Sequence, residues 1–155
     1  MKKLIIIIVI VLFAVVGMNS QTKAVKVNPV GIVFGIGNAG FEYATNDKQS
    51  LTISALYMKI QDISGIGAGL EYRFYFEESI EKWYAAPVAA YLSLKSGDES
   101  AGIFTAGAII GHQWIFGEHF LLDLNAGYGA YFGGDNLEGL SGGGISLGLS
   151  IGYAW

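Results

Sequence analysis

The chain has 155 residues, and its 9 lysines and arginines against 13 acidic residues leave a formal net charge of −4. This acidic balance argues against nucleic-acid binding, which requires a basic face, and the absence of cysteine excludes disulfides and thiol chemistry. Hydrophobic residues make up 52% of the chain and aromatic residues 14%, so the 23 glycines do not indicate disorder. The length suits one folded domain.

The N-terminus has the pattern of a secretory signal peptide. A basic start, Met1–Lys3, precedes an unbroken apolar run, Leu4–Val16. We expect residues 1–24 to be the signal peptide, cleaved between Ser20 and Ala24, and 25–155 to be the exported domain. An uncleaved anchor is the alternative, although the run is shorter than the roughly 20 apolar residues that span a bilayer.

After this segment the hydrophobic pattern has a period of two residues, which is typical of β-strands. Eight strands are predicted, at 26–36, 38–45, 50–60, 64–76, 83–95, 102–116, 119–132 and 143–155. Only Gly37 separates the first two, so a single bent strand, and seven strands in all, is the other possibility. Bacterial single-chain barrels have even strand numbers, which favours eight.

The residue composition of the two faces of the last two strands indicates which face lies toward lipid and which toward the lumen. In 143–155 large apolar residues such as Ile145 and Leu147 alternate with glycine, serine and alanine. In 119–132 one face is apolar, from Phe120 to Phe132, and the other carries Leu121, Asp123, Asn125, Gly127, Gly129 and Tyr131. Small, mostly uncharged residues make poor water-exposed surface but fit a narrow lumen, so the large residues should face lipid. The predicted fold is therefore all-β, an eight-stranded antiparallel transmembrane β-barrel. A secreted soluble barrel of the lipocalin type is the inverted alternative.

Aromatic residues fall at the two expected rims of this barrel, as the interfacial belts of such proteins do. With both termini in the periplasm, the periplasmic rim should carry Tyr43, Phe74, Phe76, Tyr84, Trp114, Phe116, Phe120 and Trp155. The opposite rim should carry Tyr57, Phe104 and Phe132, above three outer loops of which 133–142 is the longest.

Several stretches carry a family resemblance: Asn28-Pro29-Val30-Gly31 with Gly40-Phe41-Glu42-Tyr43, Gly111-His112-Gln113-Trp114, and Asn125–Gly129. With them the chain resembles a family of small outer-membrane barrels catalogued as a domain of unknown function, and more loosely the OmpA-type and OmpW-type barrels. Its end, Tyr153 and Trp155, resembles the signal read by the outer-membrane assembly machinery, except that Ser150 stands where that signal usually has glycine.

No motif supports catalysis or cofactor binding. Gly65–Leu70 approaches a dinucleotide fingerprint but lacks the last glycine and the following helix. His112 and His119 both lie at the periplasmic end of one hairpin, whereas outer-membrane acyltransferases place their histidine and serine near the outer surface. The residues two positions after them are Trp114 and Leu121, so neither matches the His-x-Ser pair of lipid A deacylases. We therefore expect no enzyme, no cofactor and no metal site.

Polar residues on the inward face predict a lumenal cluster in the periplasmic half. Its members are Glu42, Glu71, Arg73, Gln113, Asp123 and Asn125, with Arg73 as the one nearby cation for three carboxylates. Buried charges must be paired or hydrated, so a salt-bridged plug is expected. The outer half offers small residues and two tyrosines that either fill the lumen or leave a shallow vestibule: Gly65, Gly67, Gly69, Ser93, Gly107, Gly129, Ser146, Tyr91 and Tyr131.

These features predict an outer-membrane protein of a Gram-negative bacterium with a structural or interaction role in the cell envelope. Its expected partners are outer-membrane lipid and, during biogenesis, the assembly machinery, with no nucleic acid. A narrow pore or small-ligand binder is the first alternative, and a lipid-modifying enzyme is the second.

Overall fold

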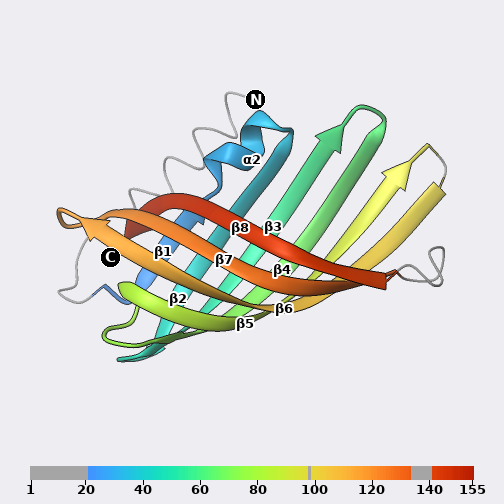
Figure 1. Ribbon diagram of the computed structural model, residues 1–155. Helices are drawn as coiled ribbons and strands as arrows, with labels where there is room; N and C mark the ends of the chain where they lie inside the picture. The colour runs from blue at the N-terminus through green and yellow to red at the C-terminus, as the bar shows by residue number, and fades with distance from the viewer. Residues whose placement is uncertain (1–20, 98, 134–140) are drawn as a thin grey trace.

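The computed structural model describes residues 21–97, 99–133 and 141–155 and folds them into one closed barrel of eight strands (Figure 1). The strands are β1 (Lys23–Val27), β2 (Ile36–Asn46), β3 (Gln49–Ile60), β4 (Ile63–Tyr75), β5 (Lys82–Ser96), β6 (Glu99–Phe116), β7 (Phe120–Gly133) and β8 (Ser141–Ala154). Each pairs antiparallel with the next, and β8 pairs with β1 to close the sheet. The all-β, eight-stranded antiparallel prediction is confirmed.

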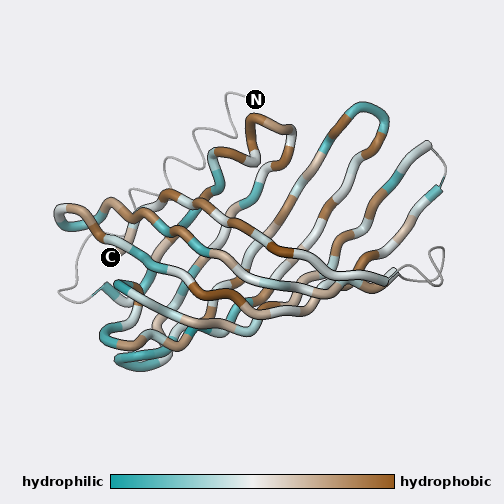
Figure 2. The backbone as a smooth tube through the Cα atoms, viewed as in Figure 1, coloured by the Kyte–Doolittle hydropathy of each residue, from teal (hydrophilic) through white to brown (hydrophobic). Residues whose placement is uncertain are grey.

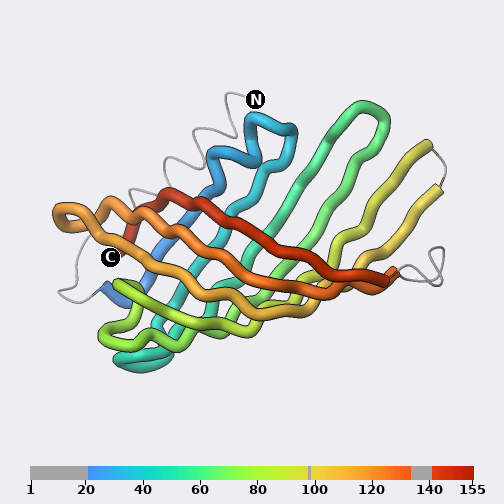
Figure 3. The backbone as a smooth tube through the Cα atoms, in the orientation of Figure 1, coloured from blue at the N-terminus to red at the C-terminus, as the bar shows by residue number. Residues whose placement is uncertain are grey.

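The start of β1 and the end of β8 lie together at one end of the barrel (Figure 3). We call this the terminal end, and it also holds the turns that follow β2, β4 and β6. The opposite end, the loop end, holds the turns that follow β3 and β5. The predicted loop 133–142 lies mostly outside the described residues, as does most of the predicted signal peptide, 1–24.

The first predicted strand, 26–36, is wrong over most of its length. β1 ends at Val27, and a five-residue helix, α2 (Pro29–Val33), follows it. Asn28 caps this helix because its side-chain oxygen accepts a hydrogen bond from the Gly31 N–H at 2.9 Å. Pro29 has no N–H to give to a strand ladder and suits a first helical turn. Among the described residues, no helix is long and apolar enough to cross a membrane.

The predicted break at Gly37 is also wrong, because β2 begins at Ile36 and includes Gly37. The chain turns at Gly35 instead, where φ is +79° and an added Cβ would lie 2.5 Å from the backbone oxygen of Lys59. Only glycine fits this left-handed position at such a close approach. Two separate strands are therefore joined by a helical turn, and the seven-strand alternative is excluded.

The distribution of apolar and polar side chains is the reverse of that in a soluble barrel. Large apolar side chains point outward and are exposed on β3, β4, β6, β7 and β8, among them Ile53, Ile66, Leu70, Ile110, Leu124, Ile145 and Leu147. Apolar and polar residues alternate along the strands, whereas strongly hydrophilic residues gather at several of the turns (Figure 2). Polar side chains such as Glu42, Arg73 and Asp123 are among the most buried in the described chain. The strands thus present apolar surface outside and bury charge inside.

Three inward and outward assignments change in β5. The sequence predicts Tyr84 in the aromatic belt of the periplasmic rim, on the outside of the barrel, but its side chain is fully buried in the lumen. Tyr91 and Ser93 were expected in the lumen, yet Tyr91 is exposed on the outer face and Ser93 shares that face by alternation. The aromatic residues Trp83 and Tyr91 mark the outward face, so an even-numbered inward face was readable from the sequence around Trp83-Tyr84.

Aromatic side chains are exposed on the outer face toward both ends of the barrel. The terminal end carries Tyr43, Phe74, Phe76, Trp83, Phe116 and Phe120, and the loop end carries Tyr57, Phe104 and Phe132. Phe116 and Phe120 pack together across the β6–β7 turn, with ring centroids 6.1 Å apart. Apart from Tyr84, the predicted sorting of aromatics toward two ends agrees with this arrangement.

Candidate functional site

The candidate site is a buried polar cluster inside the terminal half of the barrel, built by alternate residues of five strands. Its charged and amide members are Lys26 from β1, Glu42 from β2, Glu71 and Arg73 from β4, Gln113 from β6 and Asp123 from β7. Each sits on the inward parity of its strand, and the antiparallel register brings the five strands' side chains to one height. We refer to this group as the polar cluster.

Arg73 holds the centre of the polar cluster. One terminal nitrogen, Nη1, lies 2.6 Å from Asp123 Oδ2 and donates to Gln113 Oε1 at 3.0 Å. The other, Nη2, lies 2.6 Å from Glu71 Oε2, and Nε donates to the same oxygen at 2.8 Å. The guanidinium also lies 4.1 Å from the centre of the Tyr84 ring. A planar fork with several donors suits such a multidentate site better than a lysine would.

Lys26 is a second cation in the cluster, and the prediction that Arg73 is the only one nearby is wrong. Lys26 Nζ lies 2.7 Å from Glu42 Oε2 and 3.2 Å from Asp123 Oδ2. It also donates to Gln113 Oε1 at 3.3 Å. The sequence contains a signal for this inward lysine, because Lys26 alternates with Val25 and Val27 in β1. The predicted strand begins at residue 26, so this alternation was not recognised.

Neutral hydroxyl groups complete the shell around the two most buried carboxylates. Tyr75 donates to Glu42 Oε1 at 2.6 Å, and Ser50 donates to the same oxygen. Tyr84 donates to Asp123 Oδ1 at 2.8 Å. Two cations therefore balance two nearly inaccessible carboxylates, while the third, Glu71, keeps 24% of its side chain exposed and is accessible to solvent. The balance of charge and the satisfied hydrogen bonds explain how the sheet tolerates ions in its interior.

A turn seals the terminal end above the cluster. Ile80, in the β4–β5 turn, is fully buried and packs with Ala24, Leu121 and Ala154 at the mouth of the barrel. The Gln113 side-chain amide donates to the Ile80 carbonyl, which fastens this turn to the polar cluster. The sequence pattern predicts only a connection at 77–82, between the strands 64–76 and 83–95, and no buried residue in it. A lone isoleucine among four charged residues, Glu77, Glu78, Glu81 and Lys82, was the available signal.

Asn125, the last predicted member, lies beside the cluster and is weakly joined to it. Its amide Nδ2 lies 3.5 Å from Asp123 Oδ1, at the long limit of a hydrogen bond. The same side chain fills the space next to Gly148, where an added Cβ would lie 2.5 Å from Asn125 Oδ1. Asn125 therefore borders the transition from the polar cluster to the glycine-lined loop half.

The two histidines lie on the outside of the terminal half. His112 packs between Trp83 and Trp114, with ring centroids 4.9 and 4.2 Å away. His119 stacks on Tyr153 at 4.6 Å, and its Nδ1 lies 2.8 Å from the Ala154 carbonyl. Within the part of the chain that the structure describes, no group of three or more histidine, cysteine or acidic residues could hold a metal ion.

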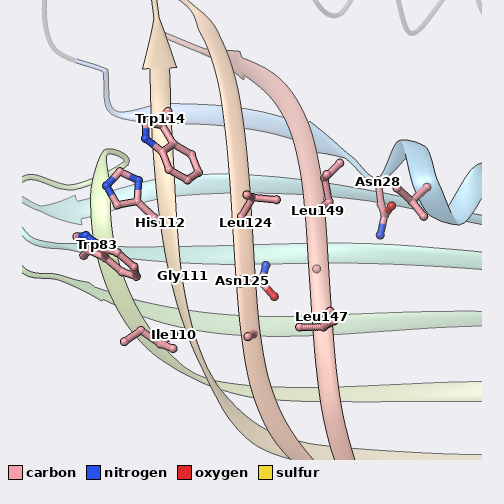
Figure 4. A pocket seen from close by; sticks show the side chains of 13 residues that line it. Asn28, Trp83, Ile110, Gly111, His112, Trp114, Leu124, Asn125, Leu147 and Leu149 are labelled. Atoms are coloured by element: carbon pink, nitrogen blue, oxygen red, sulfur yellow. The ribbon is translucent and has the colours of Figure 1, made fainter.

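An apolar groove of about 630 Å³ runs across the outer face of β6, β7 and β8 toward α2 (Figure 4). Trp83, His112 and Trp114 border one side of it, and Asn28 and Val30 border the other. Between them the outward leucines and neighbouring residues line its floor: Ile110, Leu124, Ala126, Leu147 and Leu149. The inward-facing positions Gly111, Asn125 and Gly148 also border the groove, but no member of the polar cluster lines it.

The C-terminal residues help to close the barrel. The Trp155 N–H donates to the Lys23 carbonyl and the Lys23 N–H donates to the Trp155 carbonyl, both at 2.9 Å. The Trp155 ring packs near Phe41 and near Tyr153, with centroids 6.3 and 6.0 Å away. Both residues of the predicted assembly signal therefore lie on the outer side of the β8–β1 junction.

The family described as "Protein of unknown function (DUF3575)" matches residues 5–138 of the chain, a span that contains every member of the polar cluster. No curated protein matches the chain. No solved structure matches it either.

Proposed function

The chain belongs to the DUF3575 family, whose function is unknown, and from that premise we propose that it is an outer-membrane β-barrel with a structural or interaction role in the envelope of a Gram-negative bacterium. The observation that supports this best is the inversion of the sheet, with exposed apolar side chains outside and a charged cluster inside. Such a surface is stable only where the outside is lipid. Aromatic residues at both ends fit the two headgroup regions.

Export through a cleaved signal peptide is part of this proposal, and the contacts of the first described residues support a cleavage position ahead of Gln21. The Ala44 N–H donates to the Thr22 carbonyl at 2.7 Å, and the Gln21 side-chain amide donates to the Glu118 carbonyl. Removal of these residues would leave the barrel mouth with unpaired groups. We therefore place cleavage after Ser20, at the N-terminal limit of the expected window.

The proposed lumen is plugged rather than conducting. The polar cluster crosses the terminal half, and Ile80 with its apolar neighbours closes the mouth above it. Glu42, Gln113, Ser50 and Ile80 are each 0% exposed. An eight-stranded barrel has an interior just wide enough for side chains to fill, so these layers favour a plugged scaffold over a narrow pore.

A role without catalysis is also proposed. His112 faces outward among tryptophans, and His119 lies against backbone and Tyr153 at the barrel mouth. His112 contacts the rings of Trp83 and Trp114, and His119 contacts Tyr153 and, at 3.9 Å from its Nε2, the exposed carboxylate of Glu118. None of these contacts pairs a histidine with a serine, threonine or cysteine nucleophile, which a catalytic arrangement would need. We also propose that the barrel resembles the OmpA-type and OmpW-type barrels in its architecture.

Cell fractionation and heat modifiability test the proposal together. The protein should sediment with outer membranes and migrate faster unheated than boiled on a detergent gel, because a closed hydrogen-bonded sheet resists detergent unfolding. Recovery in the soluble periplasm with no mobility shift would refute the membrane assignment. A soluble periplasmic protein expressed in the same cells is the control for leakage between fractions.

Replacement of Trp155 tests whether the C-terminus is an assembly signal. Trp155→Ala keeps the backbone hydrogen bonds with Lys23 that a deletion would remove. We expect normal export with several-fold less protein in the outer membrane and more periplasmic degradation, because the terminal aromatic ring is lost. Val25→Ala, in the same β1–β8 ladder, is the matched control for lost packing. Equal membrane levels of the two variants would contradict the assignment of Trp155.

A further inference from the structure

The two strands that close the barrel differ greatly in length. β1 pairs with β8 only from Ala24↔Ala154 to Val27↔Ile151, and the chain then leaves the sheet as α2. β8 continues to Ser141, paired with β7 along that whole stretch. On its other side, Ser141–Ser150 has no strand partner among the described residues. We call this stretch the free β8 edge.

The backbone hydrogen bonds near the C-terminus show which backbone groups the free edge presents. Lys23 and Trp155 exchange both of their N–H to O=C bonds. Ala154, the neighbouring residue, donates instead toward β7, to the His119 carbonyl at 2.8 Å. Backbone groups alternate along a strand, so the odd-numbered residues of β8 direct both N–H and C=O away from β7. Gly143, Ile145 and Leu147 therefore present a row of donors and acceptors that have no backbone partner in the described part of the chain.

Side-chain exposure independently marks the same stretch as an edge. The outward side chains of Ile145 and Leu147 are 82% and 83% exposed. On strands with a neighbour on both sides, the largest such value among the large apolar residues is 66%, at Ile66. A side chain with a neighbouring strand on just one side lacks about half of the contacts that flanking strands would give it. Glycine and serine on the inward face of the same strand leave room beside it.

The helix α2 borders the edge without completing the ladder. Phe34 and Gly35 donate their N–H groups back to the carbonyls of Gly31 and Ile32. Val33 and Phe34 are exposed, and so is much of Ile32. One flank of the opening is thus an apolar helix, and the other is a strand with unpaired backbone.

We propose that the free β8 edge is a docking site for an extended polypeptide segment of a partner, which adds a strand beside β8 in the loop half of the barrel. The inference rests on the proposed membrane location, because in lipid every unpaired backbone group costs several kcal/mol. Only another backbone supplies donors and acceptors with the two-residue period of the edge.

The chemistry of the segment follows from its neighbours. Its outward residues lie beside Ile145, Leu147 and the apolar flank of α2, so they are apolar. Its inward residues lie beside Gly144, Ser146 and Gly148, so side chains of many sizes fit. An acyl chain fits the apolar flank but cannot bond to the edge. A second copy that pairs antiparallel through β8 would need the opposite orientation in the membrane, because all strands of a barrel are fixed relative to the bilayer.

Two synthetic peptides test the docking site on refolded full-length barrel in detergent micelles. Both alternate valine and threonine over the length of Ser141–Leu147, and the second is N-methylated at alternate residues so that one edge has no donors. We expect the first peptide to slow hydrogen exchange of the Gly143, Ile145 and Leu147 amides by about tenfold or more, and the methylated peptide to leave it unchanged. No protection, or equal protection by both peptides, would overturn the proposal.

Two proline variants test the same edge without a ligand. Leu147→Pro removes an N–H that faces away from β7, so the barrel should still fold and should lose peptide binding. Ser146→Pro removes a bond to β7 and should prevent folding. Failure of Leu147→Pro to fold, or equal tolerance of both, would contradict the free edge. The chain has no native cysteine, so a single Ile145→Cys that cross-links into dimers would assign the edge to a second copy instead. Heat modifiability of the same samples reports on the proposed barrel separately.

Discussion

Replacement of Arg73 by leucine is expected to lower the free energy of unfolding by about 3–5 kcal/mol, the usual cost of removing one partner of a buried ion pair. Arg73 contacts Asp123 and Glu71 at 2.6 Å each and lies 3.6 Å from Glu42. Without it, Lys26 alone would face two nearly inaccessible carboxylates. Urea unfolding of the refolded protein in detergent measures the loss.

Three further variants separate a specific cluster from general damage. Arg73→Lys keeps the charge but not the fork, so it should lose less than Arg73→Leu. Lys82→Ala breaks the exposed pair with Glu77 and should change nothing measurable. In the double mutant Arg73→Leu with Asp123→Asn, the total loss should be smaller than the sum of the two single losses. Strict additivity would show that these side chains do not act as a unit.

Arginine at Leu124 should destabilise the barrel by about 2–4 kcal/mol in lipid, as charged residues do near the bilayer midplane of a barrel. Leu124 points outward on β7, opposite His112 of β6 and Leu149 of β8. The guanidinium would have to enter hydrocarbon or bend toward a headgroup. Reversible unfolding in lipid vesicles measures this cost.

Position along the same strand provides the control. Phe120 is also exposed on the outer face, but at the terminal rim. Arginine there should cost only about 0–1 kcal/mol from lipid contact, because the cost of charge falls toward the interface. Leu124→Ala measures lost packing without charge. If Leu124→Arg matched Leu124→Ala, the outer face of β7 would not be in lipid.

A substitution at the inward position Gly127 is expected to destabilise the barrel for a different, steric reason. An added Cβ would lie 2.3 Å from the backbone oxygen of Ala108 and 2.6 Å from Ile109 Cγ2. Any side chain at Gly127 therefore collides with β6, whatever its charge and whatever the surrounding solvent. At this position glycine is required by the close approach of β6.

The sequence by itself determined the fold class and most of the strands. A two-residue period is a local property, so the alternation of Leu122 and Leu124 with Asp123 was enough to give a strand and its two faces. The inward parity of Glu42, Arg73, Gln113 and Asp123 followed from the same count. The prediction of a strand at 26–36 was wrong because the Asn28 capping hydrogen bond and the missing N–H of Pro29 favour a helical turn over a strand with only a weak apolar pattern.

Only the tertiary structure decided which inward residues meet. Shear between strands sets their relative heights, and it brought Lys26 to Glu42 and Ile80 to the barrel mouth. Local pattern gives the direction of such a side chain but not its partners; Lys26 and Asp123, for example, form an ion pair across 97 residues of sequence. The free edge of β8 is likewise a mismatch between two strands at opposite ends of the sequence. Hydrophobic pattern fixes which way a side chain points, but closure of the sheet fixes what it touches.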